Sequence, residues 1–262
     1  MFDRGNYFAA AIEYERSYYL SDDPLRQTLA NLSKARALKQ MGAFDKALMD
    51  LRRSLPFSGA DSLRFRVLYE VAFCSHMSGD HSGAHSYLRQ IRYFFPDGPG
   101  LKKIRLLESL NLVQREQWEE LQGFLADSWL AEPVDSLVRR MAVEIDSLLS
   151  PASIPLVRKP ERARLYATFV PGLGHFYAGA PGRGLLNASS QLLSLGVFGV
   201  LALNGFYISG FTAGLGLFQS FYFGGIRQAG ELTAAANNER MRAFKEQLSQ
   251  MLISLENQIQ EK

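Results

Sequence analysis

The stretch "GLLNASSQLLSLGVFGVLALNGFYISGFTAGLGLFQSFYFGGI", residues 184–226, contains no Asp, Glu, Lys or Arg, although 21% of the 262 residues of the chain are charged. A transmembrane helix needs about 20 mostly apolar residues, so this stretch has room for two spans and a short turn. Asn204 and Gly205 interrupt it near its middle and favour a reversal of the chain. The sequence therefore predicts a two-helix membrane hairpin, with spans at 185–203 and 206–226.

Two features favour lipid over the alternative, a hairpin buried in a soluble helical bundle. Basic residues flank the stretch but are absent from its turn: Arg158, Lys159, Arg162, Arg164 and Arg183 precede it, and Arg227, Arg240, Arg242 and Lys245 follow it. Small residues that let membrane helices approach closely recur within it: Gly196, Gly199, Gly210 and Gly214. The Lys and Arg bias places both ends of the hairpin in the cytoplasm, so we expect an integral membrane protein.

The first part of the chain carries an internal repeat with a step of 37 residues. Four short segments share this register: Gly5-Asn6-Tyr7, Gly42-Ala43-Phe44, Gly79-Asp80-His81 and Glu116-Gln117-Trp118. Small or apolar residues follow at one fixed offset, namely Ala10, Ala47, Ala84 and Leu121, and larger ones four residues later, namely Tyr14, Leu51, Leu88 and Leu125. We expect the first residue of each segment to end a helix, the ring at its third position to cover the turn, and the following positions to share one helical face.

The segments "GNYFAAAIEYERS" (5–17), "GAFDKALMDLRRS" (42–54) and "GDHSGAHSYLRQI" (79–91) resemble the second half of the tetratricopeptide repeat, and "EQWEELQGFLADS" (116–128) resembles it more weakly. The resemblance implies a solenoid of paired helices that binds a protein or peptide. The first helices of the pairs are expected at 29–41, 62–78 and 101–114, with a closing helix at 134–149. Because the first repeat begins at its turn, either a segment upstream, with a signal peptide, completes it, or the first unit is degenerate.

These patterns predict an all-α chain in four parts. Residues 1–150 form the repeat domain, and 151–162, with three prolines, form a linker. Residues 163–227 form the two-span domain, and 228–262 form an amphipathic helix. The apolar seam of that last helix consists of Met241, Phe244, Leu248, Met251 and Leu255, and we expect it to dock on the repeats or on a second copy of the chain.

The hairpin is preceded by "VPGLGHFYAGAPGRGLL", residues 170–186. The third glycine of a dinucleotide fingerprint and the lysine of a phosphate-binding loop are both missing, so neither site is predicted. We expect instead a hinge: Pro171 and Gly172 end a short amphipathic helix, and Phe176 and Tyr177 lie at the depth of the lipid headgroups. What we call the hinge motif comprises Pro171, Gly172, Gly174, His175, Phe176, Tyr177, Gly179, Gly182 and Gly184.

With its G-x-G-x-FY-x-G pattern, the hinge motif resembles the signature of the TM-two-type family of small bacterial domains with two transmembrane helices. The resemblance covers about residues 160–227 and implies membrane insertion more directly than any activity. The acidic residue usual at the end of the second span is absent from "FYFGGIRQAG" (221–230). The resemblance and the basic flanks together favour a bacterial inner membrane with cytoplasmic repeats, or with periplasmic repeats if a signal peptide precedes Met1.

Few residues suggest chemistry. Cys74, His76, His81 and His85 lie within twelve residues and could be considered as metal ligands, but His81 occupies the ring position of a repeat turn, and we expect no metal and no cofactor. His175 could bind a ligand or a proton or serve as an interfacial hydrogen bonder. No nucleophile, base and acid occur together, so an enzyme is not expected. A net charge of +3 is too small to indicate nucleic acid binding.

The sequence thus favours a membrane-anchored adaptor that binds a protein or peptide on its repeats and tethers it to a bacterial membrane. The alternative is an oligomeric channel or transport accessory protein built on the two-span domain, since the glycine pairs and the polar start of the first span suit helix association. In either case the expected partners are protein and membrane lipid, with a homo-oligomer as a further expectation.

Overall fold

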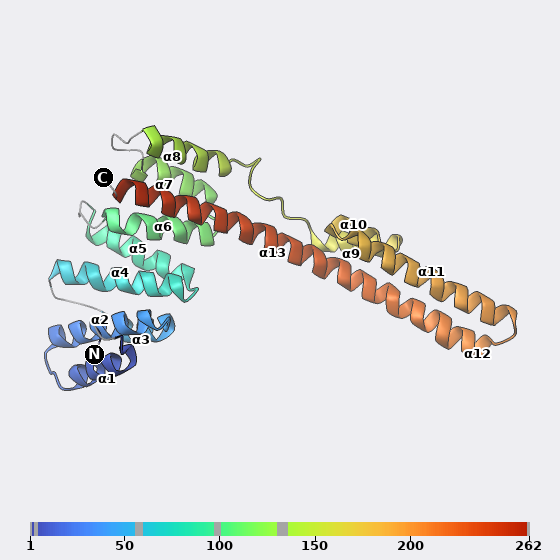
Figure 1. Cartoon of the computed structure of the whole chain (residues 1–262), viewed down its shortest axis with the longest axis horizontal. Coiled ribbons are helices and arrows are strands. Elements are labelled where there is room, and N and C mark those ends of the chain that lie inside the picture. Colours follow the sequence, from blue (N-terminus) through green and yellow to red (C-terminus); the bar gives the residue numbers. More distant parts are fainter. Residues whose placement is uncertain (1, 3–4, 56–59, 97–100, 130–135, 261–262) are drawn as a thin grey trace. The chain divides into compact units, whose positions relative to one another are not determined.

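The computed structural model describes residues 2, 5–55, 60–96, 101–129 and 136–260, and its secondary structure in these ranges is helical, without a strand (Figure 1). The chain divides into two compact units. Unit 1 comprises Met1–Ser150 together with Leu248–Lys262, and unit 2 comprises Pro151–Gln247. The prediction of an all-α chain is therefore confirmed for the described residues.

Unit 1 is built from helices that pack one on the next in the order of the chain. They are α1 (Tyr7–Tyr19), α2 (Pro24–Gln40), α3 (Phe44–Arg52), α4 (Asp61–Met77), α5 (His81–Phe94), α6 (Leu101–Gln114), α7 (Trp118–Trp129) and α8 (Ser136–Leu148). Every second helix begins at the ring position of the 37-residue register, at Tyr7, Phe44, His81 and Trp118. All four of these side chains are half-buried.

The turns before these helices share a left-handed backbone. The angle φ is +75° at Gly5, +70° at Gly42, +87° at Gly79 and +59° at Glu116. This conformation is costly for a residue with a Cβ atom, which explains why glycine stands at three of the four positions. Glu116 is the only residue other than glycine with a positive φ in the described part of the chain.

Two of these turns have the same hydrogen bonds. The N–H of Ala43 donates to the carbonyl of Leu38 at 3.0 Å, and the equivalent N–H of Gln117 donates to the carbonyl of Leu112 at 3.1 Å. Such bonds satisfy carbonyl groups that the end of a helix leaves free. Glu116 therefore adopts the geometry of a turn that normally takes glycine.

The core of unit 1 follows the same register. Ala47 and Ala84 are fully buried at the small position, and Leu51 and Leu88 are fully buried four residues later. The outer two repeats differ slightly, since Tyr14 is half-buried and Leu121 fills the small position with a larger side chain. The pattern of small and large residues thus corresponds to sites where neighbouring helices touch.

The first helices of the pairs lie close to their predicted ranges. Helix α6 has the predicted bounds, and α4 differs by one residue at each end. Helix α2 begins at Pro24, earlier than residue 29, because Asp23 caps it: the Asp23 carboxylate accepts from the N–H of Leu25 at 3.0 Å, and Pro24 suits the first helical turn. The predicted start of the closing helix, at 134, lies outside the described residues.

Unit 2 contains α9 (Pro160–Phe169), α10 (Leu173–Ala178), α11 (Pro181–Leu203), α12 (Tyr207–Ser209), the π-helix η2 (Gly210–Leu215) and the first part of α13 (Gly216–Gln260). Helix α11 and the segment formed by η2 and α13 run beside each other as a hairpin (Figure 1). Asn204 caps α11, and Gly205 turns the chain with φ of +83°. The predicted turn is thus at its expected place.

Two helix boundaries differ from the sequence prediction. The predicted second span, 206–226, is not one uninterrupted α-helix, because it consists of α12, η2 and the start of α13. Nor is there a break at 227–228, since α13 continues through it to Gln260. No proline or capping glycine occurs there to end the helix.

The last part of α13 belongs to unit 1. Its Leu248, Leu252 and Leu255 have no exposed surface. Nearby, Arg105 on α6 donates through Nε and Nη2 to one carboxylate oxygen of Glu256, at 3.1 and 2.9 Å, and both side chains are buried. Of the two expected docking surfaces, α13 therefore uses the repeats of its own chain.

Candidate membrane-insertion site

The hinge motif forms the two turns on either side of the short helix α10. Gly172 precedes α10 with φ of +84°, and Gly179 follows it with φ of +85°. Pro181 occupies the first turn of α11, where its missing N–H costs nothing. The chain therefore changes direction twice within a few residues, and it does so at positions where glycine adopts a conformation that other residues rarely adopt.

Glycines of the motif also allow backbones to touch. A Cβ atom placed on Gly172 would lie 2.4 Å from the carbonyl oxygen of Gly184, on α11. One placed on Gly174 would lie 2.2 Å from the carbonyl oxygen of Ala163 and 2.9 Å from the Cβ of Ala229. Helices α9, α10 and α13 therefore meet at a point that only glycine fits, whereas Gly182 faces open space.

His175 is fully buried at this meeting point. Its Nε2 lies 3.0 Å from the Oε1 of Gln228 on α13, so Nε2 carries the proton and donates. No hydrogen-bond partner of Nδ1 occurs in the described residues. Phe176 and Leu173 of the same helix are partly exposed, so α10 buries its histidine and turns apolar side chains outward.

The segment before α9 is fixed to α13 by an amide clamp. The N–H of Arg158 donates to the Oδ1 of Asn237 at 3.0 Å, and the Nδ2 of Asn237 donates back to the carbonyl of Arg158 at 2.7 Å. The Nη1 of Arg158 donates to the carbonyl of Tyr177. Sequence reasoning missed this clamp, although it singled out Arg158 as one of the flanking basic residues.

The two arms of the hairpin touch through small residues. A Cβ atom on Gly214 would lie 2.4 Å from the Cβ of Phe198, and one on Gly210 would lie 3.3 Å from the Cβ of Leu201. Both glycines belong to the π-helix η2. Gly196 and Gly199, which were expected to pack helices as well, have nothing within 4 Å of the corresponding position, because they face away from the second arm.

A further close contact lies nearer the base of the hairpin. A Cβ atom on Gly225 would lie 2.4 Å from the side-chain amide of Asn187. The Nδ2 of Asn187 donates to the carbonyl of Phe221 at 3.0 Å, and Gln191 donates to the Oδ1 of Asn187 at 2.8 Å. Polar side chains at the start of α11 thus connect the two arms. Gly225, Ala229 and Thr233 are small residues four apart that are all buried, so their spacing in the sequence was a signal that this face of α13 is covered.

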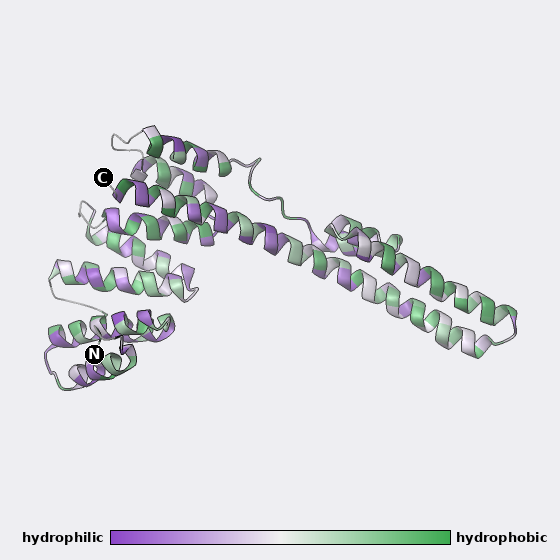
Figure 2. Ribbon diagram, viewed as in Figure 1, coloured by the Kyte–Doolittle hydropathy of each residue, from purple (hydrophilic) through white to green (hydrophobic). Residues whose placement is uncertain are grey.

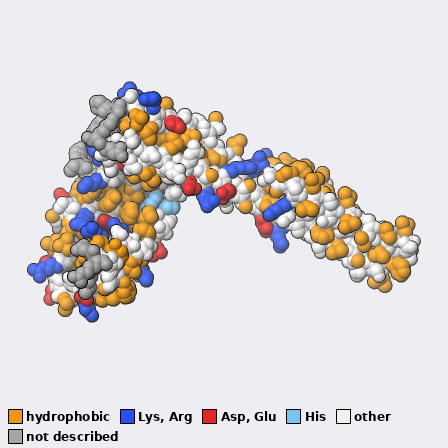
Figure 3. All heavy atoms as spheres, viewed as in Figure 1, with side chains coloured by type: hydrophobic (Ala, Val, Ile, Leu, Met, Phe, Trp, Pro, Cys, Tyr) orange, Lys and Arg blue, Asp and Glu red, His pale blue; other side chains and the backbone are white. Residues whose placement is uncertain are grey.

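The hairpin exposes most of its apolar side chains. In the described part of the chain, α11 is the one helix that is long and apolar enough to cross a membrane, and only 11% of its most apolar stretch is buried. The strongly exposed side chains include Leu192, Leu193, Val200 and Leu203 on α11 and Tyr207, Ile208 and Phe211 on the second arm. Figure 2 shows both arms in the colours of apolar residues, and in Figure 3 the charged side chains of unit 2 lie toward the hinge motif.

The residues considered as metal ligands do not form a site. Cys74 is fully buried, and burial raises the pKa of its thiol to about 12. The rings of His76 and His81 lie 5.0 Å apart, and burial, followed by the charge of His81, lowers the pKa of His76 to about 4. Within the described ranges, no group of three or more His, Cys, Asp or Glu side chains could hold a metal ion.

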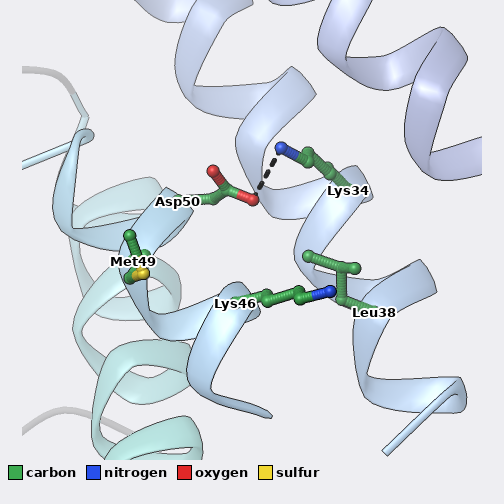
Figure 4. Close-up of a pocket in the computed structure, with 5 residues that line it drawn as sticks. All are labelled: Lys34, Leu38, Lys46, Met49 and Asp50. Carbon is green, nitrogen blue, oxygen red and sulfur yellow. Dashed lines mark ion pairs between the residues drawn. The ribbon is translucent and has the colours of Figure 1, made fainter. Parts of the chain in front are cut away.

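A shallow hollow lies between α2 and α3 in unit 1 (Figure 4). It has a volume of about 190 Å³ and is lined by Lys34, Leu38, Lys46, Met49 and Asp50. Lys34 lies 2.7 Å from Asp50; burial lowers the pKa of Lys34, but hydrogen bonds to Asp50 and Glu15 outweigh burial and raise it. In the structure as described, Lys46 has no such ion pair and points toward Leu38.

Comparison with family models, curated proteins and solved structures finds no match for the chain.

Proposed function

We propose that the chain is a membrane-anchored adaptor, in which a tetratricopeptide-like repeat unit binds a protein or peptide and the hairpin holds it at a bacterial inner membrane. The observation that carries the proposal is the exposure of uncharged apolar side chains along both arms of the hairpin. Monomeric soluble proteins rarely expose so large an apolar surface. In lipid the same side chains are in their favoured environment, and helices satisfy their own backbone groups.

The repeat unit supports the binding half of the proposal. Four left-handed turns and four helix starts follow one 37-residue register, as in a solenoid built of stacked helix pairs. The hollow between α2 and α3 places the ammonium group of Lys46 beside the apolar side chain of Leu38, and Met49 lines the same hollow. A peptide with an acidic residue next to an apolar one would suit it.

The channel alternative has weaker support. The polar side chains at the start of α11 would have to line a pore, yet Gln191 and Ser194 are buried. Gln191 donates to Asn187 within α11, Asn187 in turn donates to the carbonyl of Phe221 on the second arm, and the hydroxyl of Ser194 donates to the carbonyl of Ser190 within α11. Asn187 is thus used for helix association, the commoner role of such side chains in membranes, and the other two bond within their own helix. We expect no ion flux from the chain in liposomes.

Labelling of single cysteines in intact and permeabilised cells tests the anchor and its orientation. Because Cys74 is buried and its thiol pKa is raised, the natural cysteine reacts slowly with maleimides, and Cys74→Ala removes it altogether. In that background Asn204→Cys reports on the hairpin turn and Ser82→Cys, which is exposed on α5, reports on the repeats. The proposal predicts opposite sides: Asn204→Cys reacts with an impermeant maleimide in spheroplasts, and Ser82→Cys reacts only after permeabilisation. The anchor would be refuted if both cysteines were labelled equally in the intact spheroplasts and if carbonate released the chain from the membrane fraction.

A further inference from the structure

Two guanidinium groups converge on the exposed turn at Gly179. A Cβ atom placed on Gly179 would lie 3.9 Å from Arg158 Nη1 and 3.9 Å from Arg240 Nη2. The two nitrogens therefore lie no farther apart than the sum of these distances. Gly179 itself is exposed, so the space between the two cations is accessible from outside the protein. Two charge-assisted hydrogen bonds of about 2.8 Å each would let one phosphate group bridge the pair.

Arg158 is held in place by the protein. Its backbone is fixed by the amide clamp to Asn237, and its Nη1 donates to the carbonyl of Tyr177. A guanidinium group has five N–H donors in a fixed plane, so one bond to a carbonyl leaves donors for a ligand. The ordering of this side chain is thus already achieved before any ligand arrives, which favours binding.

No carboxylate neutralises this pair in unit 2, all of whose residues the structure describes. Neither Arg158 nor Arg240 has an ion pair there, whereas Arg242 pairs with Glu239 and Arg227 pairs with Glu231. Pro151–Gln247 contains nine Lys and Arg residues and only four Asp and Glu residues. Two like charges this close repel each other, and a bound anion would remove that repulsion.

The pair also lies beside the start of the hairpin. Helix α11 begins at Pro181, two residues after Gly179, and the uncharged stretch begins at Gly184. Phe169, Leu173 and Phe176, on α9 and α10, are partly or largely exposed. A lipid whose phosphate lies between the arginines would therefore find apolar side chains near its acyl chains.

We propose that Arg158 and Arg240, whose guanidinium groups meet at Gly179, bind the phosphate group of an anionic phospholipid. The inference rests on the proposed membrane anchor and adds the lipid class that the anchor prefers. Two cations without a counter-ion favour a headgroup with net negative charge over a zwitterionic one, as basic pockets at membrane surfaces generally do.

The test measures binding of short-chain phosphatidylglycerol, phosphatidylcholine and inorganic phosphate to the full chain purified in a neutral detergent. We expect phosphatidylglycerol to bind at least about tenfold more tightly than phosphatidylcholine, in keeping with a charge-assisted hydrogen bond. Arg240→Gln, whose side chain is exposed, should lose most of this preference. Arg242→Gln is the matched control. It removes the same charge two residues further along α13, but from a side chain that already pairs with Glu239, so it should change the preference less than about twofold.

The outcomes separate the lipid site from the anchor. Equal losses in the Arg240 and Arg242 variants, or no preference in the natural chain, would overturn the site, and so would inorganic phosphate binding as tightly as phosphatidylglycerol. Insertion of the same variants into pure phosphatidylcholine vesicles, measured by resistance to carbonate, reports on the anchor alone. Insertion without lipid preference refutes only the site, whereas failure of the natural chain to insert refutes the proposed function.

Discussion

Replacing Glu116 by glycine should stabilise unit 1, although glycine substitutions usually destabilise helical proteins. Glu116 has φ of +59° at the turn where the three other repeats have glycine. A left-handed residue with a Cβ atom costs about 1–2 kcal/mol, whereas glycine adds about 0.5–1 kcal/mol of chain entropy to the unfolded state. The balance predicts a gain of about 1 kcal/mol in the free energy of unfolding. Glu116→Ala keeps the Cβ atom and should give no such gain.

Urea unfolding of the full chain in detergent, followed by tryptophan fluorescence, measures this difference. Both tryptophans of the chain, Trp118 and Trp129, lie in unit 1, so the signal reports on the repeats even though the hairpin is present. The reverse changes, Gly42→Ala and Gly79→Ala, meet no atom within 4 Å, so they should destabilise by about 1 kcal/mol through the backbone alone. If Glu116→Ala stabilised as much as Glu116→Gly, the reasoning from backbone conformation would be wrong.

Three further predictions follow from buried groups. The pKa of His76 is lowered from 6.5 to about 4 in the folded chain, so the unfolded state takes up the proton first as the pH falls. The free energy of unfolding should therefore drop by about 2 kcal/mol between pH 7.5 and pH 5. Urea unfolding of His76→Gln at the two pH values should lack this part of the drop. Arg105→Ala leaves the buried carboxylate of Glu256 without its partner and should cost about 3–5 kcal/mol, whereas the apolar pair Arg105→Met with Glu256→Leu should cost much less; thermal unfolding of both compares them. Gly214→Leu places a side chain where Phe198 already lies 2.4 Å away and should separate the arms of the hairpin, measured as faster proteolysis of the reconstituted chain, while Gly199→Leu, in open space, should not.

The parts of the fold that follow from the sequence are those with a local cause. A left-handed turn favours glycine, and the ring at the third position of each segment is the first residue of the next helix, so a 37-residue register predicts where α1, α3, α5 and α7 begin. Asn204 and Gly205 mark the hairpin turn for the same reason, because the chain cannot reverse there without a residue that tolerates positive φ. Each of these signals involves neighbouring residues only.

The parts that were missed depend on residues far apart in the chain. Arg105 and Glu256 are separated by 151 residues, and neither stands out among the other charged residues of helices with mixed polarity. The amide clamp joins Arg158 to Asn237 across 79 residues. An asparagine in a polar helix has many roles, and only the packed structure shows that this one bonds both backbone groups of a single residue.

The hinge motif shows how a glycine-rich sequence that resembles a ligand site can have a packing origin. Gly172, Gly174 and Gly184 are the positions where an added Cβ atom would collide with backbone or with an alanine, so their spacing reflects where α9, α10, α11 and α13 touch. His175 is buried in the same contact and bonds to Gln228, which gives the histidine that follows Gly174 a structural role. Two glycines of the motif are exposed and differ from these. Gly182 faces open space, whereas a Cβ atom added to Gly179 would lie near two arginine side chains. If the motif recognises anything outside the protein, we therefore expect the contact at Gly179, beside two cationic side chains, and not at the buried histidine.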